Sequence, residues 1–202
     1  MNKLKSFMTH AGTFATAYGA ASLTHYFFQG GEDVTLSKVL LVFGVRGAIA
    51  LLSSRFPSHK PSLEKEKIVS LADKKEVREA FLNGKWRIPL LYGMFIAPVI
   101  EETIFRLPVV YYPSFNPLTA AVFGYLHKDP IVPVSSTLTV LHSAIAGATF
   151  GAVAISYGWW AGTLLHILNN MFSLAPIYVL LARNEEKIKE FVKEHIPESE
   201  NP

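Results

Sequence analysis

The sequence has no cysteine and carries few charges. Without cysteine, the 202-residue chain has no disulfide, no thiolate metal site and no cysteine nucleophile. Only 17% of its residues are charged, against about 25% in an average soluble protein, and half are hydrophobic. Between Pro89 and Ala182 there are only five Asp, Glu, Lys or Arg residues. This composition predicts an integral, multi-pass membrane protein with the lipid bilayer as a partner, placed in the cell membrane if the source is prokaryotic.

Long apolar runs, separated by prolines and charges, predict an all-α, polytopic transmembrane helix bundle with about six membrane segments. The fourth expected segment is short, because a helix needs about 20 apolar residues to cross a bilayer. The first segment is long and lacks a clear small-residue cleavage site, so we expect a retained helix and not a cleavable signal peptide. The six segments are expected at residues 7–28, 34–54, 88–108, 115–127, 132–157 and 159–182.

Two charged stretches, 55–87 and 183–202, are expected to form amphipathic helices in water or at the membrane interface. Nine of the nineteen Lys and Arg residues lie in the first stretch together with five acids, so the basic charge belongs to one loop and we expect no nucleic-acid partner. These boundaries divide the chain into an N-terminal transmembrane pair with its basic loop, a helix bundle and a charged tail, at 1–87, 88–182 and 183–202.

Three of the five charges lie together at residues 101–106 (EETIFR), inside an expected span. A charged side chain at mid-bilayer costs about 2.5 to 3.5 kcal/mol, so it is normally paired or lines a hydrated cavity. On a helix, Glu102 and Arg106 share a face and are expected to pair, while Glu101 points away from both. A carboxyl group in low-dielectric surroundings holds its proton more tightly, which suits Glu101 for general acid–base work. The structural alternative is a buried ion network that joins helices.

Two further polar motifs lie in separate apolar segments. Phe123 and His127 are four residues apart, so the aromatic ring can pack against the imidazole; the alternative for His127 is a capping or interfacial role. His166 and Asn170, also four apart, present an imidazole and a carboxamide to one neighbour, or else they hydrogen-bond another helix. Asn169 lies about 100° round the helix from Asn170, and we expect it to make a structural bond.

The three motifs in this order, EExxxR, FxxxH and HxxxN, resemble the CPBP intramembrane protease family, also called the Abi or CAAX-protease type II family. The resemblance covers roughly residues 89–175, and residues 158–166 (GWWAGTLLH) also resemble the approach to the last motif. Leu107-Pro108 departs from the family pattern, in which small residues are common at this place. The resemblance implies an endopeptidase that hydrolyses a peptide bond of a membrane-associated protein or peptide, such as a prenylated CAAX protein.

The resemblance also implies a role for each motif residue. Glu101 and His127 are expected to activate a water molecule, and His166 with Asn170 is expected to bind the oxyanion. His142, near the middle of the fifth expected segment, is the alternative second imidazole. The supporting residues are Glu102, Arg106 and Phe123.

A metal ion is a separate question, because two histidines and a carboxylate make an acceptable catalytic zinc shell. If a divalent metal such as zinc is bound, its ligands are expected to be Glu101, His127 and His166. The chain has no HExxH motif, and asparagine is a poor zinc ligand. A metal-free mechanism that depends on the glutamate is therefore preferred.

Counting residues from the ends of the spans predicts where the site lies. Glu101 and His166 each lie seven residues from a span end, near Pro108 and Trp159, so both are about 10 Å from the same membrane face. The positive-inside rule puts the basic loop in the cytoplasm, whereas this layer lies nearer the opposite face. Because CAAX trimming needs a cytoplasmic site, either the rule misleads here or the substrates are not prenylated CAAX proteins.

Two other classes of function fit the same residues. One is a non-catalytic, Abi-like membrane scaffold or immunity protein that keeps the bundle. The other is a small proton-coupled transporter, in which Glu101, His127 and His166 form a proton relay.

Overall fold

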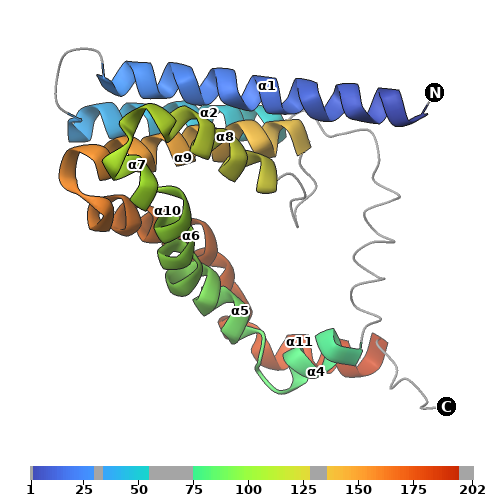
Figure 1. The fold of residues 1–202 in the computed structure, drawn as a ribbon. Coiled ribbons are helices and arrows are strands. Elements are labelled where there is room, and N and C mark those ends of the chain that lie inside the picture. Colours follow the sequence, from blue (N-terminus) through green and yellow to red (C-terminus); the bar gives the residue numbers. More distant parts are fainter. Residues whose placement is uncertain (1, 30–33, 55–74, 128–135, 196–202) are drawn as a thin grey trace. The chain divides into compact units, whose positions relative to one another are not determined.

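Every element in the described part of the chain is a helix (Figure 1). The computed structural model describes residues 2–29, 34–54, 75–127 and 136–195. In chain order the elements are α1 (Asn2–Gln29), α2 (Leu36–Ser54), α4 (Lys75–Leu82), α5 (Arg87–Leu91), the π-helical turn η1 (Tyr92–Ile96), α6 (Ala97–Phe105), α7 (Leu107–Tyr111), the 3-10 turn η2 (Pro113–Phe115), α8 (Asn116–Leu126), α9 (Ser136–Tyr157), α10 (Trp159–Arg183) and α11 (Glu185–His195).

The all-α prediction is confirmed, and each of the six expected membrane segments contains a helix. Among the described residues, three helical stretches are long and apolar enough to cross a membrane, which is compatible with a membrane protein. The helix in the short fourth segment, α8, has 11 residues and a length of about 17 Å, against about 30 Å for the hydrocarbon core. The count of six spans stays a prediction. The three candidate spans are Arg87–Phe105, Thr137–Tyr157 and Trp159–Arg183.

The expected segment 88–108 does not run on as one helix. The helix that begins at Arg87 ends at Phe105, and α7 starts at Leu107 with Pro108 in its first turn. Proline has no backbone N–H and therefore cannot donate to the carbonyl of Ile104, as a continuing helix requires. In the first turn of a new helix the missing N–H costs nothing, so the chain breaks here and restarts.

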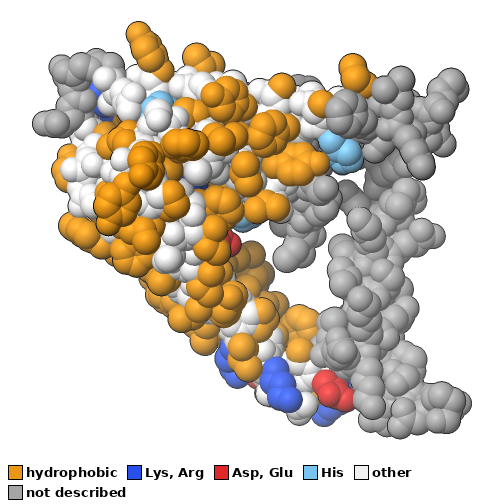
Figure 2. Space-filling view, viewed as in Figure 1, with side chains coloured by type: hydrophobic (Ala, Val, Ile, Leu, Met, Phe, Trp, Pro, Cys, Tyr) orange, Lys and Arg blue, Asp and Glu red, His pale blue; other side chains and the backbone are white. Residues whose placement is uncertain are grey.

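The two charged stretches are helical where the structure describes them. The first is represented by α4 and the second by α11; the expected helical residues 55–74 and 196–202 lie outside the described part. The two helices pack against each other, and Arg87, just after α4, forms an ion pair with Glu185 at the start of α11. Figure 2 shows lysine, arginine and acidic side chains gathered over these two helices.

The chain forms two compact units. The first unit holds the described residues up to 54 and residues 100–166, and the second unit holds residues 75–99 and 167–195. In the first unit, α8 packs against both α1 and α9, while α2 and α7 also contact α9. In the second unit, Trp86 packs on Tyr178 with ring centroids 5.6 Å apart, which holds the start of the α5 region against the second half of α10.

Small side chains form one core cluster of the first unit. Alanine lets helix backbones approach closely, which is how helices associate in lipid, where burial of apolar surface gives no driving force between them. Gly158, at the turn between α9 and α10, has φ +92°, a backbone conformation that residues with a side chain rarely adopt. The core cluster consists of Ala17, Ala21, Ala120, Ala121, Val140, Ala144 and Ala148.

Candidate active site

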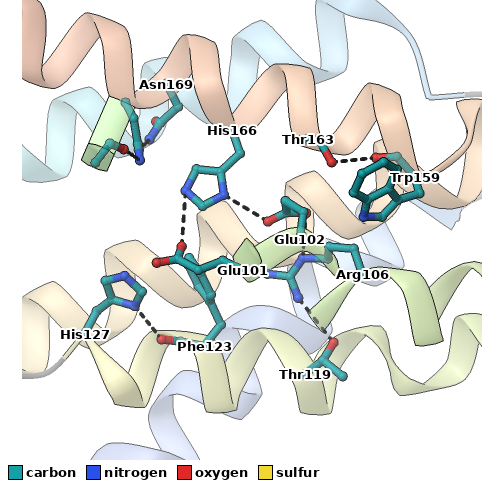
Figure 3. A network of polar contacts seen from close by, with 12 residues as sticks. Glu101, Glu102, Arg106, Thr119, Phe123, His127, Trp159, Thr163, His166 and Asn169 are labelled. Atoms are coloured by element: carbon teal, nitrogen blue, oxygen red, sulfur yellow. Dashed lines mark hydrogen bonds and ion pairs between the residues drawn. The ribbon is translucent and has the colours of Figure 1, made fainter. Parts of the chain in front are cut away.

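His166 lies between two carboxylates in the first unit (Figure 3). Its Nδ1 is 3.0 Å from Oε1 of Glu102, and its Nε2 is 3.7 Å from Oε2 of Glu101. The Glu102 side chain is fully buried, whereas that of Glu101 is 29% exposed. The last turns of α6 and the first half of α10 therefore bring together side chains that are 64 residues apart in the sequence.

The pair expected between Glu102 and Arg106 is present. Nε of Arg106 lies 3.4 Å from Oε2 of Glu102, and both side chains are fully buried. In this ion pair Glu102 is a carboxylate, which can only accept hydrogen bonds. The contact between Glu102 and His166 therefore requires that Nδ1 of the imidazole carries a hydrogen and donates it.

Two groups on neighbouring helices hold the Arg106 guanidinium in place. Nη1 donates to Oγ1 of Thr119 at 3.3 Å, and that hydroxyl donates to the carbonyl of Asn116 at 3.1 Å. On α9, Gly147 lies so close that an added Cβ would stand 2.5 Å from Nη2. A side chain at this position would require the guanidinium to shift, so glycine leaves the room that the buried cation occupies.

The ring of Phe123 links the two histidines. Its centroid is 4.4 Å from that of His127 and 5.7 Å from that of His166, and the Arg106 guanidinium lies 5.1 Å from it. The contact with His127 is the one expected from the four-residue spacing. Phe123 also meets the ring of Phe105 edge-on at 5.6 Å, so it is enclosed on several sides and itself restricts both imidazoles.

His127 lies at the C-terminal end of α8, with its side chain exposed. Its Nδ1 is 2.7 Å from the carbonyl oxygen of Phe123, and a carbonyl only accepts, so Nδ1 must carry the hydrogen. In the neutral ring, Nε2 then has a lone pair. The capping role, which was the alternative for His127, is the contact observed, and a role for its Nε2 in catalysis stays a prediction.

The face of the His166 ring is covered by Phe150. The two rings are stacked, with centroids 4.5 Å apart and planes at 19°, and Phe150 is buried on α9. Phe150, Thr119 and Gly147 belong to the surroundings of the site but were not predicted from the sequence. A phenylalanine, a threonine or a glycine in an apolar helix resembles ordinary core, and no spacing within α8 or α9 indicates which faces meet α6 and α10.

Asn170 lies in the second unit, where it bonds a neighbouring helix. Its Nδ2 donates to the carbonyl of Gly93 at 2.9 Å, while Nδ2 of Asn169 donates to Oδ1 of Asn170 at 3.1 Å. Asn170 therefore bonds a neighbouring helix, which was the structural alternative to the oxyanion contact that the resemblance implies. An amide nitrogen has two hydrogens, so this bond uses one of them.

The backbone explains why Gly93 needs a side-chain donor. In η1 the N–H of Ala97 bonds to the carbonyl of Tyr92, five residues back, and not to that of Gly93. The following residue, Pro98, has no N–H to offer. The Gly93 carbonyl therefore receives a backbone hydrogen bond from neither Ala97 nor Pro98. The side-chain amide of Asn170 donates to it instead.

The groups expected to bind zinc are not arranged as a metal site. Within residues 2–29, 34–54, 75–127 and 136–195, no three His, Cys, Asp or Glu side chains stand where they could hold a metal ion, and this includes Glu101, His127 and His166. The alternative imidazole, His142, is paired elsewhere in the first unit. Its Nδ1 lies 3.3 Å from Nη2 of the buried Arg46 on α2 and accepts from it.

Comparison with protein-family models, curated proteins and solved structures gives no match to this chain. The likeness to the CPBP family therefore rests on the three motifs.

Proposed function

We propose that the protein is a membrane-embedded endopeptidase of the CPBP type, which hydrolyses a peptide bond of a membrane-associated protein or peptide. The observation that carries the proposal is the position of His166 between Glu102 at 3.0 Å and Glu101 at 3.7 Å. Glu102 is already paired with Arg106, which leaves Glu101 as the carboxylate for a reacting water. A gap of 3.7 Å is too long for a direct hydrogen bond, so both atoms keep capacity for a reacting oxygen.

In the proposed reaction Glu101 takes a proton from water, and the water oxygen attacks the carbonyl carbon of the peptide bond. The carbonyl electron pair moves onto oxygen, and this oxyanion accepts a hydrogen bond from Nε2–H of His166, a contact worth about 3 to 4 kcal/mol. Glu101 then passes the proton to the amide nitrogen as the C–N bond breaks. The products are a carboxylic acid and an amine, and Glu101 is a carboxylate again.

Charge balance supports this role for His166. When both of its nitrogens are protonated, Glu101, Glu102, Arg106 and His166 carry two negative and two positive charges. Buried charges are tolerated when they are paired, so a balanced set of four suits a site that is largely shielded from water. Glu102 stabilises the doubly protonated ring because its carboxylate accepts the hydrogen bond from Nδ1–H. The same bond orients Nε2 towards the reacting atoms.

His127 and Asn170 complete the proposed set. The lone pair on Nε2 of His127 is a second acceptor for the proton of the water. For Asn170, the N–H that does not bond Gly93 is the second oxyanion donor that the resemblance implies. Glu101 and His166 supply the base and the oxyanion donor from the chain itself, so the proposal keeps the preference for a metal-free mechanism.

The test is cleavage of a membrane-anchored reporter peptide by the purified protein in proteoliposomes. Glu101→Gln keeps the shape of the side chain and removes the base, so kcat is expected to fall at least about 100-fold. The matched control is Glu190→Gln, an exposed acid on α11, which is expected to leave cleavage unchanged. Thermal unfolding establishes that both variants are folded.

Three outcomes contradict the proposal. Full cleavage by folded Glu101→Gln removes the glutamate from the chemistry. Absence of cleavage by the unsubstituted protein, together with a proton flux that Glu101→Gln abolishes, assigns the residues to transport. Absence of both, with biological activity intact in the variant, assigns the protein to the scaffold or immunity class.

Cleavage that survives chelation, in protein shown to be free of metal, supports the metal-free mechanism.

A further inference from the structure

We propose that the second half of α10 binds an anionic phospholipid, with an acyl chain along an apolar groove and the phosphate at Arg183. The groove has a volume of about 640 Å³ and runs along α10 from Leu168 to Arg183. Its lining residues recur every three or four positions, so they form one stripe of the helix. Among the described residues that line the groove, only Arg183, at its end, is charged.

The groove exposes more apolar surface than water tolerates. Phe172 is 83% exposed and Leu180 is 62% exposed, and both lie in the stripe. Only 6% of the most apolar part of α10 is buried inside the protein, against 61% for the corresponding part of α9. Because α10 is long and apolar enough to cross a membrane, hydrocarbon is the medium that suits this face.

The shape of the groove favours a lipid chain over another helix. At two places where helices of the first unit approach most closely, the contact residue is glycine: an added Cβ at Gly124 would lie 2.6 Å from the carbonyl of Val140, and one at Gly162 would lie 2.8 Å from that of Phe150. Such contacts are typical of helix pairs in lipid. The groove instead presents large side chains, which hold a helix backbone away but pack against a flexible acyl chain.

The charge at the end of the groove selects the headgroup. Arg87 pairs with Glu185, and Lys189 pairs with Glu185 and Glu186, whereas Arg183 makes no hydrogen bond or ion pair with the described residues. A guanidinium binds phosphate through two parallel hydrogen bonds. The C-terminal end of a helix repels anions, so the phosphate contact depends on the Arg183 side chain and not on the backbone.

The dimensions agree with one lipid leaflet. From Leu168 to Arg183 there are fifteen helical steps, or about 22 Å, and half of the hydrocarbon core is about 15 Å. An acyl chain whose headgroup lies at Arg183 therefore stays beside the groove through its whole leaflet. This inference needs α10 to span the membrane, and it is independent of any catalytic activity.

The test uses quenching of tryptophan fluorescence by brominated lipids. Phe172→Trp places a probe in the groove, and the signal of the three native tryptophans is subtracted with the unsubstituted protein. The vesicles contain phosphatidylcholine with either brominated phosphatidylglycerol or brominated phosphatidylcholine. We expect a relative affinity about fivefold higher for the anionic lipid, the factor that corresponds to about 1 kcal/mol for one basic side chain. Arg183→Gln should abolish the preference, and Arg183→Lys should keep most of it.

A control position and a second probe make the result decisive. Ile177→Trp lies on the same helix, is exposed and is outside the groove lining, so it should be quenched equally by both lipids. Leu180→Trp is a second groove probe, and it should reproduce the preference. Equal quenching at both groove positions would mean ordinary boundary lipid and would overturn the proposal. Quenching by neither lipid would mean that protein covers the face, which overturns it as well.

Discussion

Glu101 and Glu102 carry the same side chain at adjacent positions, yet their surroundings differ. Glu102 is fully buried and contacts both Arg106 and His166, whereas Glu101 is 29% exposed and faces only Nε2 of His166. The difference follows from the turn of about 100° between successive helical residues. One carboxylate is therefore enclosed by its two partners, and the other is partly exposed.

At the residue scale, the space that the Arg106 guanidinium occupies depends on glycine at position 147, which has no side chain. In Gly147→Ala, the new Cβ would stand 2.5 Å from Nη2 of a fully buried guanidinium and 3.1 Å from the ring of Phe123, so these side chains would have to shift within the core. We expect a loss of about 1 to 3 kcal/mol in the free energy of unfolding, the usual effect of overpacking a core. Chemical denaturation in detergent measures this loss.

The matched control for that change is Gly44→Ala on α2, where an added Cβ meets nothing within 4 Å. Alanine is the better helix former, so this variant is expected to be as stable as the unsubstituted protein or more stable. If Gly147→Ala behaves in the same way, the guanidinium does not lie where the structure places it.

At the scale of the element, the helix that carries the two glutamates is interrupted by the wide turn η1. A π-helical turn contains one more residue than an α-helical turn, so it rotates the following residues relative to an unbroken α-helix. Its weak point is the Gly93 carbonyl, which depends on Asn170 because Pro98 has no N–H.

This dependence predicts coupling between Asn170 and Pro98. Asn170→Ala leaves the Gly93 carbonyl unsatisfied and should cost about 1 to 3 kcal/mol of unfolding free energy. In a Pro98→Ala background the new N–H can bond that carbonyl, so the same change should cost about 1 kcal/mol less. A double-mutant cycle of denaturation free energies measures the difference.

Ser173→Ala provides the reference cycle for this prediction. Ser173 lies on the same helix, but its hydroxyl bonds to the carbonyl of Asn169 within α10. Its effect should be the same with proline or alanine at position 98. Additive effects of Asn170→Ala and Pro98→Ala would show that the asparagine does not replace the missing backbone donor.

At the scale of the whole molecule, the ends of α10 differ in character. Its C-terminal end at Arg183 is followed by the charged helix α11, and its N-terminal end follows the turn at Gly158. If α10 spans the membrane, these ends lie on opposite sides, and the positive-inside rule puts the charged end in the cytoplasm. His166 is then about 10 Å from the opposite face. For the proposed protease, this position favours substrates other than cytoplasmic prenylated proteins.

The absence of cysteine makes this orientation easy to test. In intact cells, a membrane-impermeant maleimide should label a cysteine at Ser156 near the end of α9. It should label Lys187→Cys on α11 only after the membrane is opened. Both positions are exposed, so a difference in labelling reports the side of the membrane. Labelling of both from outside contradicts a cytoplasmic α11, and labelling of neither contradicts the placement of Ser156.

The sequence by itself determined the helices and the contacts made within one of them. Apolar runs predicted where helices lie, and four-residue spacing predicted the Glu102–Arg106 pair and the Phe123–His127 contact, because helical geometry repeats along the chain. Only the tertiary structure decided which helix faces meet. The stacking of Phe150 on His166 depends on how separate helices fit together, and no spacing within a helix encodes that fit.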